Sequence, residues 1–191
     1  KAFFFYFLVS LGAEQTSFST IVGSGPNGAL PHALLGERKL QKGDLVVLDF
    51  GAVYEGYCSD ETRTISIGAA SAEQKERYQL VLDAQLAALK AIRPGVMSLE
   101  VDRIARDIIA DAGYGEYFGH GLGHSLGIDI HESPRFSPTL DSTRMVENMV
   151  MTVEPGIYIP EWGGIRIEDL VVVKSEGCEI LSKTSKALLE I

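Results

Sequence analysis

Apolar residues follow two patterns along the chain: the continuous runs of core strands and the spacing of helices. Residues 45–54 and 57–67 are rich in apolar and β-branched residues and flank the turn Glu55-Gly56, so they predict a hairpin. Residues 149–159 and 164–174 predict a second pair of strands. The chain therefore contains two strand pairs that lie far apart in the sequence.

Two helices are predicted between these strand pairs. In the first, residues 72–92, apolar residues recur at helical spacing: Tyr78, Leu82, Leu86 and Leu89. Ser71 and Gln74 have the spacing of a capping box at its start. Residues 98–112 form the second helix, with Ser98 as its predicted N-cap.

The first nine residues are a lysine followed by a short apolar run. This pattern is found in secretory signals, and it is also the pattern of a buried helix that ends at Gly12. The run is much shorter than the ~20 residues that a membrane span requires. We interpret it as the end of a core helix whose beginning is missing.

The predicted elements run in the order helix, strands, helices, strands. That order is typical of an α+β fold in which a largely antiparallel sheet is covered by helices on one face. Each strand pair also carries two acidic residues, which indicates that the chain consists of two related halves.

A glycine-rich segment, residues 23–28, follows a short predicted strand at residues 17–22. Its spacing matches the dinucleotide-binding pattern G-x-G-x-x-G, but such a site requires a helix that opens at the glycines. Pro26 and Pro31 interrupt the segment. We therefore expect an ordinary glycine-rich loop near a site rather than a nucleotide-binding oxidoreductase.

The charge balance excludes some classes of partner. The 191 residues include 26 Asp and Glu against 17 Lys and Arg, which gives a formal net charge of −9. Nucleic acids and anionic membrane surfaces require clustered cations, so we expect neither as a partner. Because there are only two cysteines, Cys58 and Cys178, we expect a reducing, cytoplasmic location.

Two acids of the first strand pair lie where a carboxylate needs a partner. Asp49 follows the apolar run 45–48 of a core strand, where an unpaired charge is costly. Asp60 lies on the returning strand, and hairpin strands run ~4.8 Å apart, so both carboxylates can face one cation. Two alternatives stay open: Asp49 as the cap of a turn, and Asp60 as a solvated loop acid.

Glu154 and Glu168 repeat this arrangement in the second strand pair. Glu154 ends an apolar strand, and Glu168 lies two positions after Arg166, so the side chains of Arg166 and Glu168 share one face of their strand. The arginine is therefore either half of a structural ion pair with the glutamate or a residue of a site.

The four histidines lie in segments rich in turn residues: His32, His120, His124 and His131. A lone loop histidine is usually a surface residue, but three of these lie within 12 positions, among glycines that let the backbone approach a ligand. Four converging carboxylates would repel one another, and two divalent cations would offset that repulsion. Such a metal pair can hold a bridging hydroxide and polarise a carbonyl, which is hydrolase chemistry.

Six motifs are spread over nearly the whole chain: Leu48-Asp49-Phe50-Gly51-Ala52, Ser59-Asp60-Glu61-Thr62-Arg63-Thr64, Gly119-His120-Gly121-Leu122-Gly123-His124, Ile130-His131-Glu132, Val153-Glu154-Pro155-Gly156-Ile157-Tyr158 and Arg166-Ile167-Glu168-Asp169. At this spacing they resemble metallopeptidase family M24, in particular its Xaa-Pro peptidase branch of prolidase and aminopeptidase P. The resemblance implies a pita-bread fold: a curved, largely antiparallel sheet with covering helices and two pseudo-symmetric halves.

The resemblance also implies five metal ligands: Asp49, Asp60, His124, Glu154 and Glu168. Asp49 would chelate one metal ion and His124 would complete the other, while Asp60 and Glu168 would bridge the two. Glu154 would in addition accept the proton of the attacking water.

Four further residues match positions that line the active site in this family. His32 would shuttle protons or contact the substrate, and His131 would stabilise the tetrahedral oxyanion. His120 and Arg166 would orient the substrate and the ligands.

The function implied is hydrolysis of the Xaa-Pro bond in dipeptides or short peptides by a hydroxide that bridges two divalent ions. Mn²⁺ is the favoured ion, and Co²⁺ or Zn²⁺ would also suit this shell of ligands. The alternatives are a methionine aminopeptidase-like enzyme and a non-catalytic pita-bread module that binds peptides. We expect residues 1–191 to be a single catalytic domain that lacks a preceding N-terminal domain, and the full-length protein to be a homodimer.

Overall fold

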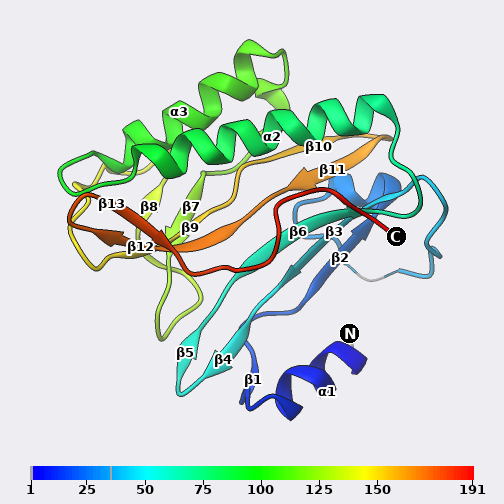
Figure 1. Ribbon diagram of the computed structural model, residues 1–191, viewed down its shortest axis with the longest axis horizontal. Coiled ribbons are helices and arrows are strands. Elements are labelled where there is room, and N and C mark those ends of the chain that lie inside the picture. The colour runs from blue at the N-terminus through cyan, green and yellow to red at the C-terminus, as the bar shows by residue number, and fades with distance from the viewer. Residues whose placement is uncertain (1, 35) are drawn as a thin grey trace.

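The computed structural model describes residues 2–34 and 36–191, and it contains two main sheets (Figure 1). The first sheet has the order β14-β6-β3-β2, with β2 (Ile21–Ser24), β3 (Leu45–Phe50), β6 (Glu61–Ser66) and β14 (Leu189–Glu190). The second has the order β13-β12-β9-β7-β8, with β7 (Gly123–Ser125), β8 (Glu132–Phe136), β9 (Val150–Val153), β12 (Asp169–Lys174) and β13 (Gly177–Ile180).

Two smaller sheets extend the main ones. One consists of β1 (Gln15–Thr16), β4 (Ala52–Tyr54) and β5 (Tyr57–Cys58), and the other of β10 (Gly156–Ile159) and β11 (Gly163–Arg166). Within the described residues the strand pairs are antiparallel apart from β14 and β6, which run parallel. This arrangement confirms the predicted α+β class with largely antiparallel pairing.

The two long helices, α2 (Ala72–Ala91) and α3 (Ser98–Asp111), lie together on one side of the sheets (Figure 1). Their apolar faces supply fully buried side chains such as Val81 and Ile109 to one core. From the sheets, Met151, Ile165 and Val171 pack into the same core. The predicted covering of one sheet face by helices is therefore confirmed.

The start of α2 is capped as the sequence predicts. The Ser71 hydroxyl accepts a hydrogen bond from the Gln74 backbone N–H at 3.1 Å, and the Gln74 side chain accepts one from the Ser71 N–H at 2.8 Å. Two of the backbone N–H groups that a helix start leaves unpaired are satisfied in this way.

The predicted N-cap of α3 was wrong. Ser98 is the first residue of the helix and Met97 holds the cap position, without a side-chain cap. The Ser98 hydroxyl instead accepts a hydrogen bond from the Thr143 N–H at 3.0 Å. A contact with a segment 45 residues away thus uses the oxygen that would otherwise have capped the helix.

The first helix, α1 (Ala2–Ser10), was correctly predicted as a helix but wrongly placed in the core. It ends before Gly12, whose φ of 104° is readily adopted only by glycine, yet none of its residues is buried. Its one aromatic contact is an edge-to-face packing of Phe4 on Phe50, with ring centroids 4.9 Å apart. The helix is apolar all round, so its sequence could not show which face, if any, is covered.

No helix in the described part of the chain combines the length and the apolarity that crossing a bilayer demands. The short 3-10 helices η1 (Gly25–Ala29) and η2 (Gly115–Tyr117) complete the set of helical elements in these residues.

Each of the four long predicted strands is interrupted, and the prediction of continuous strands was therefore wrong. The breaks fall at Gly51, Ser59-Asp60, Glu154-Pro155 and Ile167-Glu168. At each break the chain passes from one sheet to another, as where β9 of the second main sheet gives way to β10 of a small sheet. At Gly51 a side chain would collide with the Ser59 carbonyl, which explains why glycine occupies the first break.

The short strand predicted at residues 17–22 is displaced. Strand β2 begins only at Ile21, and Ser17 lies outside it, with its hydroxyl donating to the Ser59 carbonyl at 2.8 Å. The strand position is set by pairing with β3, in which Ile21 lies opposite Asp49.

Candidate metal centre

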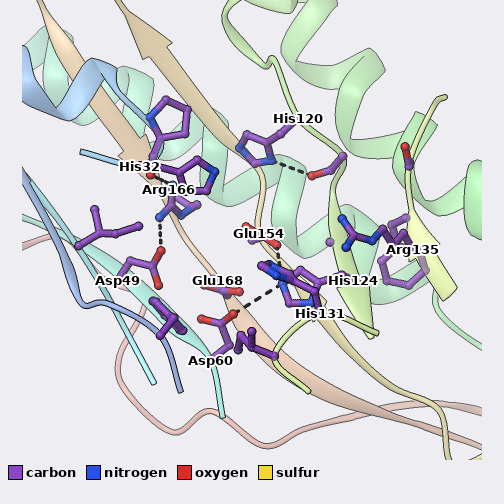
Figure 2. Close-up of a pocket in the computed structure, with 18 of the residues that line it drawn as sticks. His32, Asp49, Asp60, His120, His124, His131, Arg135, Glu154, Arg166 and Glu168 are labelled. Carbon is purple, nitrogen blue, oxygen red and sulfur yellow. Dashed lines mark hydrogen bonds and ion pairs between the residues drawn. The ribbon is translucent and has the colours of Figure 1, made fainter. Parts of the chain in front are cut away.

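A cavity of about 550 Å³ lies between the two main sheets (Figure 2). It is lined by every residue that the sequence analysis placed in the site. The side chains come from widely separated segments: His32, Asp49, Asp60, His120, His124, His131, Glu154, Arg166 and Glu168. Their convergence is a property of the fold, because no two of the four acids are closer than 11 positions in the sequence.

The strand breaks bring the acids to the cavity. Asp60, Glu154 and Glu168 lie in breaks, where the side chain is not committed to either face of a regular sheet. Backbone hydrogen bonds still hold the breaks, because the Glu154 N–H donates to Leu122 and the Glu168 N–H donates to Thr62. Asp49 lies within β3, directly opposite Thr62 of β6.

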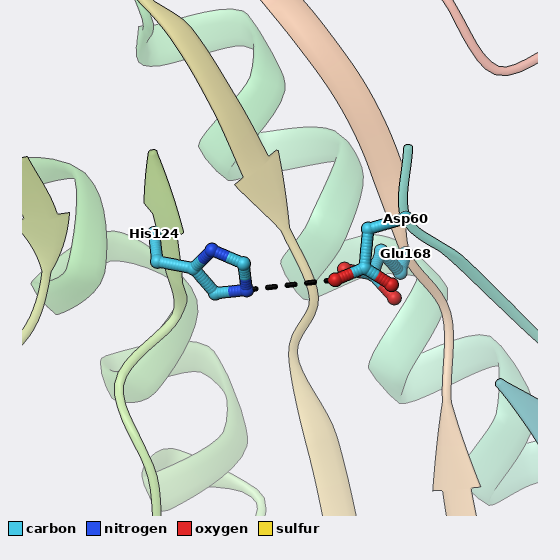
Figure 3. Close-up of side chains that lie close together, drawn as sticks. All are labelled: Asp60, His124 and Glu168. Carbon is cyan, nitrogen blue, oxygen red and sulfur yellow. Dashed lines mark ion pairs between the residues drawn. The ribbon is translucent and has the colours of Figure 1, made fainter. Parts of the chain in front are cut away.

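Asp60, His124 and Glu168 form the tightest group, with one ligand atom from each within 4.8 Å of the others (Figure 3). His124 Nε2 lies 3.6 Å from Asp60 Oδ2 and 3.5 Å from Glu154 Oε1. All three residues of the group are buried. Asp49 lines the same cavity without belonging to this tightest group.

The hydrogen bonds of His124 prepare its outer nitrogen to bind a cation. Its Nδ1 lies 3.0 Å from the Ser125 carbonyl, which can only accept, so Nδ1 carries the proton. Nε2 faces the carboxylates of Asp60 and Glu154. Burial lowers the pKa of His124, but the interaction with Asp60 and the charge of Glu154 outweigh it and raise the pKa, which favours a proton on Nε2 when no metal is bound. A metal ion bound between these atoms would take the place of that proton.

Burial, together with neighbouring negative charges, raises the pKa values of three of the acids. Burial, with the charge of Asp60 acting in the same direction, raises the pKa of Asp49 to about 6 despite the nearby Arg166. Burial also raises the pKa of Glu154 to about 7. For Glu168, burial and the charges of Asp60 and Glu154 raise the pKa well above its usual value.

Two carboxylate oxygens in the cavity are fully buried and have no hydrogen-bond partner among residues 2–34 and 36–191. These are Asp49 Oδ1 and Glu168 Oε1. Unpaired buried oxygens are costly, and carboxylate oxygens with one imidazole are a suitable shell for Mn²⁺, Co²⁺ or Zn²⁺. The residues present therefore fit divalent cations, which would also lower the raised pKa values by favouring the charged carboxylates.

Arg166 forms its ion pair with Asp49 rather than with Glu168, its neighbour on the strand. Its Nη2 donates to Asp49 Oδ2 (Figure 2). Its Nη1 donates to the Tyr158 hydroxyl at 2.8 Å. The nearer sequence neighbour was therefore the wrong partner, because β11 lies against β3, the strand that carries Asp49. Arg166 holds Asp49 by one oxygen and leaves the other free.

The other histidines differ in how firmly they are held. His120 Nδ1 lies 2.7 Å from the Gly121 carbonyl and Nε2 lies 2.9 Å from the Tyr158 hydroxyl, and burial lowers its pKa to about 4. His131 is exposed to the cavity and packs edge-on against the His124 ring, with centroids 4.5 Å apart. Its pKa is lowered by partial burial and by His124, so near neutral pH it is an uncharged imidazole.

The glycine-rich segment has a packing role. It forms the five-residue helix η1, too short for a dinucleotide site, and Gly28 lies directly against Gly164 of β11. A side chain at Gly164 would collide with the Gly28 carbonyl. This close approach brings the Pro31 carbonyl within 3.2 Å of Arg166 Nη1 and places the adjacent His32 in the cavity wall.

Sequence reasoning missed Arg135, which also lines the cavity. It lies on β8 directly opposite His124 of β7, and Figure 2 shows it beside that histidine. Within residues 2–34 and 36–191 its side chain has no ion-pair partner. The signal available was its place four residues after His131, but Pro134 concealed strand β8, which begins one residue after that histidine.

Comparison with known proteins gives consistent matches. Residues 1–175 match metallopeptidase family M24. An Xaa-Pro dipeptidase from Pyrococcus horikoshii is 48% identical over 184 residues, which are 96% of this chain and 52% of the relative. The chain thus spans about half the length of the curated relatives it matches.

Solved structures agree with these matches. A prolidase from Pyrococcus horikoshii superposes with a TM-score of 0.95 at 48% identity, covering 98% of this chain and 54% of that one. An X-Pro aminopeptidase from Thermotoga maritima gives a TM-score of 0.96 at 46% identity, covering 100% and 54%. The pita-bread fold implied by the motifs is confirmed.

The raised pKa values predict that metal-free protein loses stability as the pH rises. Between about pH 4 and pH 7 the folded state holds protons on Asp49 and Glu154 that the unfolded chain has already released. Unfolding then releases protons, so the free energy of unfolding falls with rising pH. In chelator, we expect the melting temperature to fall from pH 5 to pH 7.5, and added Mn²⁺ to raise it more at pH 7.5.

Calorimetry of the chain and of Glu168→Gln checks this prediction. The variant lacks one of the interacting carboxyls and should show a shallower fall of melting temperature with pH. A melting temperature that is flat or rising over this range in chelator, or a larger Mn²⁺ effect at pH 5, would contradict the electrostatic account.

Proposed function

The chain belongs to metallopeptidase family M24, and on that basis we propose that it is the catalytic part of an enzyme that hydrolyses Xaa-Pro dipeptides with two divalent metal ions. One observation carries the proposal. Four carboxylates and one imidazole from separate segments line a single cavity, and two of their buried oxygens lack a hydrogen-bond partner in the described part of the chain. When they are charged, acids this close repel one another, and divalent cations are a counter-charge that also does hydrolytic chemistry.

The metal ions would be held by the side chains that the motifs identified: Asp49, Asp60, His124, Glu154 and Glu168. When bound, they would polarise the scissile carbonyl and make water a better nucleophile at neutral pH. Mn²⁺ is our first choice, because the shell is rich in oxygen and has one nitrogen donor.

Glu154 is the residue best placed to take a proton from water. It is half-buried at the cavity wall, whereas Asp49, Asp60 and Glu168 are buried. The Thr152 hydroxyl donates to its Oε1 at 3.1 Å and holds the carboxylate in position. We propose that Glu154 accepts the proton of the attacking water and passes it to the departing proline nitrogen.

His131 is the group we assign to the developing negative charge on the substrate carbonyl oxygen. Its ring is exposed to the cavity, and it packs edge-on against a proposed metal ligand, His124. As a neutral imidazole it can donate one hydrogen bond to that oxygen. His32, exposed at the opposite wall, is assigned to substrate contact or proton transfer.

His120 and Arg166 would act on the ligands through hydrogen bonds. Arg166 holds Asp49 through a hydrogen bond. The Tyr158 hydroxyl lies between Arg166 and His120: it accepts a hydrogen bond from Arg166 and is hydrogen-bonded to the His120 ring. Both ring nitrogens of His120 are engaged, so we assign it a place in orienting the site rather than in moving protons.

Arg135 supports a dipeptide as the substrate class. The proline of an Xaa-Pro dipeptide ends in a carboxylate, whereas the proline of a longer peptide continues into a neutral amide. An exposed guanidinium beside His124, with no ion-pair partner in the described residues, can bind that carboxylate with a two-pronged hydrogen bond. The cavity volume of about 550 Å³ lies in the usual range for small ligands, roughly 300–1,000 Å³.

The two alternatives have less support. A non-catalytic module would have no reason to keep all five proposed ligands in one cavity. A methionine aminopeptidase-like enzyme would not need a cation for the carboxylate of a dipeptide. Homodimer formation and a cytoplasmic location stay predictions.

The proposed function predicts metal-dependent cleavage of dipeptides such as Ala-Pro. We expect release of proline by the full-length protein in Mn²⁺, and loss of activity in excess chelator that returns when Mn²⁺ is restored. Ala-Ala serves as the comparison dipeptide. Cleavage that is indifferent to chelator, or no cleavage at any metal concentration, would rule the proposal out.

The assignment of Arg135 predicts a selective defect in Arg135→Met. A hydrogen bond to a charged group contributes about 1.5–3 kcal/mol, so kcat/KM for Ala-Pro should fall roughly 10- to 100-fold. Ala-Pro-amide, which lacks the carboxylate, should be cleaved equally by wild type and variant. Arg103→Met on the exposed side of α3 is the matched control. Equal losses for both substrates would show that Arg135 does not read the carboxylate.

A further inference from the structure

Arg63 is a buried arginine behind the metal centre that none of the proposed steps uses. It is 5% exposed, and its guanidinium donates five hydrogen bonds. An arginine has five N–H donors, so every one is engaged. Four of the five acceptors are backbone carbonyls, and the fifth is a carboxylate oxygen of Asp169 at 2.8 Å.

Two of the carbonyls belong to residues at or close to the proposed metal ligands. Nη1 donates to Thr62 at 2.9 Å and also to the carbonyl of Glu168 itself. Thr62 lies two positions after Asp60, at the start of β6. One nitrogen of Arg63 thus joins the backbone of the break that holds Glu168 to the strand that follows Asp60.

The other two carbonyls belong to the C-terminal tail. Nη2 donates to Thr184 at 2.8 Å and Nε donates to Ser185 at 3.2 Å. The tail leaves β13 and runs back to the first sheet, where β14 pairs with β6 (Figure 1). Arg63 therefore ties the tail to the metal centre.

Asp169 completes the arrangement from the side next to Glu168. One of its oxygens accepts from Arg63, and the other accepts from Gln85 of α2 and from Lys186 of the tail, both at 2.8 Å. Asp169 and Gln85 are fully buried. We call the four side chains the tail clamp: Arg63, Gln85, Asp169 and Lys186.

The tail clamp bears directly on where the Glu168 carboxylate lies. The Thr62 hydroxyl donates to Glu168 Oε2 at 2.6 Å, while the Thr62 carbonyl accepts from the Glu168 N–H. The position of Thr62 relative to Glu168 thus sets the direction of the carboxylate, and Arg63 holds both backbones. The remaining oxygen, Oε1, is buried and has no hydrogen-bond partner among residues 2–34 and 36–191.

We propose that Arg63 is a positioning residue of the metal centre, which keeps Glu168 in register with the Asp60 strand and recruits tail residues 184–186 for that purpose. The proposal rests on the proposed function only in taking the cavity as a metal site. A lysine at this position has three donors, so at least two of the five acceptors would lose their partner. Arg63→Lys would therefore keep the positive charge but lose the arrangement of hydrogen bonds.

The test compares Arg63→Lys with Arg38→Lys in the full chain. Arg38 also makes a two-pronged ion pair, with Asp44 at 2.6 and 2.8 Å, but does not line the cavity. Metal-free proteins are titrated with Mn²⁺ and followed by electron paramagnetic resonance, which distinguishes free ions from a coupled pair. Ala-Pro cleavage at saturating Mn²⁺ gives kcat and KM separately.

We expect Arg63→Lys to bind Mn²⁺ about 10- to 100-fold more weakly, the range for residues that hold metal ligands, with a weakened coupled-pair signal. Its kcat should fall more than its KM changes, while Arg38→Lys should match wild type in both. Mn²⁺ affinity, coupled signal and kcat equal to wild type, even with a lower melting temperature, would overturn the proposal and leave Arg63 a stabilising residue only.

If Arg63→Lys fails to fold, Lys186→Met tests the proposal in its place. Lys186 is the partly exposed member of the tail clamp, with a side chain 21% exposed, so we expect its loss to be milder. A smaller fall in Mn²⁺ affinity supports the proposal, and unchanged affinity overturns it. Wild-type protein that binds Mn²⁺ pairs yet cleaves no Xaa-Pro peptide would refute the proposed function, while the Mn²⁺ titrations would still decide the proposal for Arg63.

Discussion

Mutual repulsion among buried carboxylates is the constraint on which the rest of this structure depends. Asp49, Asp60, Glu154 and Glu168 line one cavity, and two of their oxygens have no hydrogen-bond partner. Close like charges with little water raise one another's pKa and oppose folding, so such a cluster persists only where a cation offsets it or where the surrounding fold holds it in place. Here the fold is built to hold the cluster, and divalent cations would offset its charge.

Interrupted strands and two arginines behind the acids hold the carboxylate cluster in place. Three acids lie in breaks where the chain passes between sheets, so their side chains leave the alternation of a regular strand. Behind them Arg166 fixes Asp49, and Arg63 fixes the backbone of Glu168. Backbone hydrogen bonds and buried ion pairs thereby fix the geometry of the proposed ligands, whereas His131 and Arg135 are exposed and line the cavity.

Much of the fold and of the candidate site could be predicted from local sequence patterns and motifs. The capping box of α2, the α+β class and the presence of nine site residues in one cavity followed from spacing and motifs. What failed depended on contacts distant in sequence. Ser98 bonds to Thr143 instead of capping its helix, and Arg166 pairs with Asp49, 117 residues away, instead of its neighbour. Arg63 stood inside a recognised motif, but its role is visible only once Thr184 and Ser185 lie against it.

The central claim is that the five ligand candidates together hold two divalent ions. Crystals of the protein grown with Mn²⁺ test it most directly, by anomalous scattering recorded near the manganese absorption edge. The account predicts two anomalous peaks roughly 3.5–4 Å apart, surrounded by Asp49, Asp60, His124, Glu154 and Glu168. No peak in this cavity at saturating Mn²⁺, or peaks whose neighbours exclude the carboxylates of Asp60 and Glu168, would contradict it.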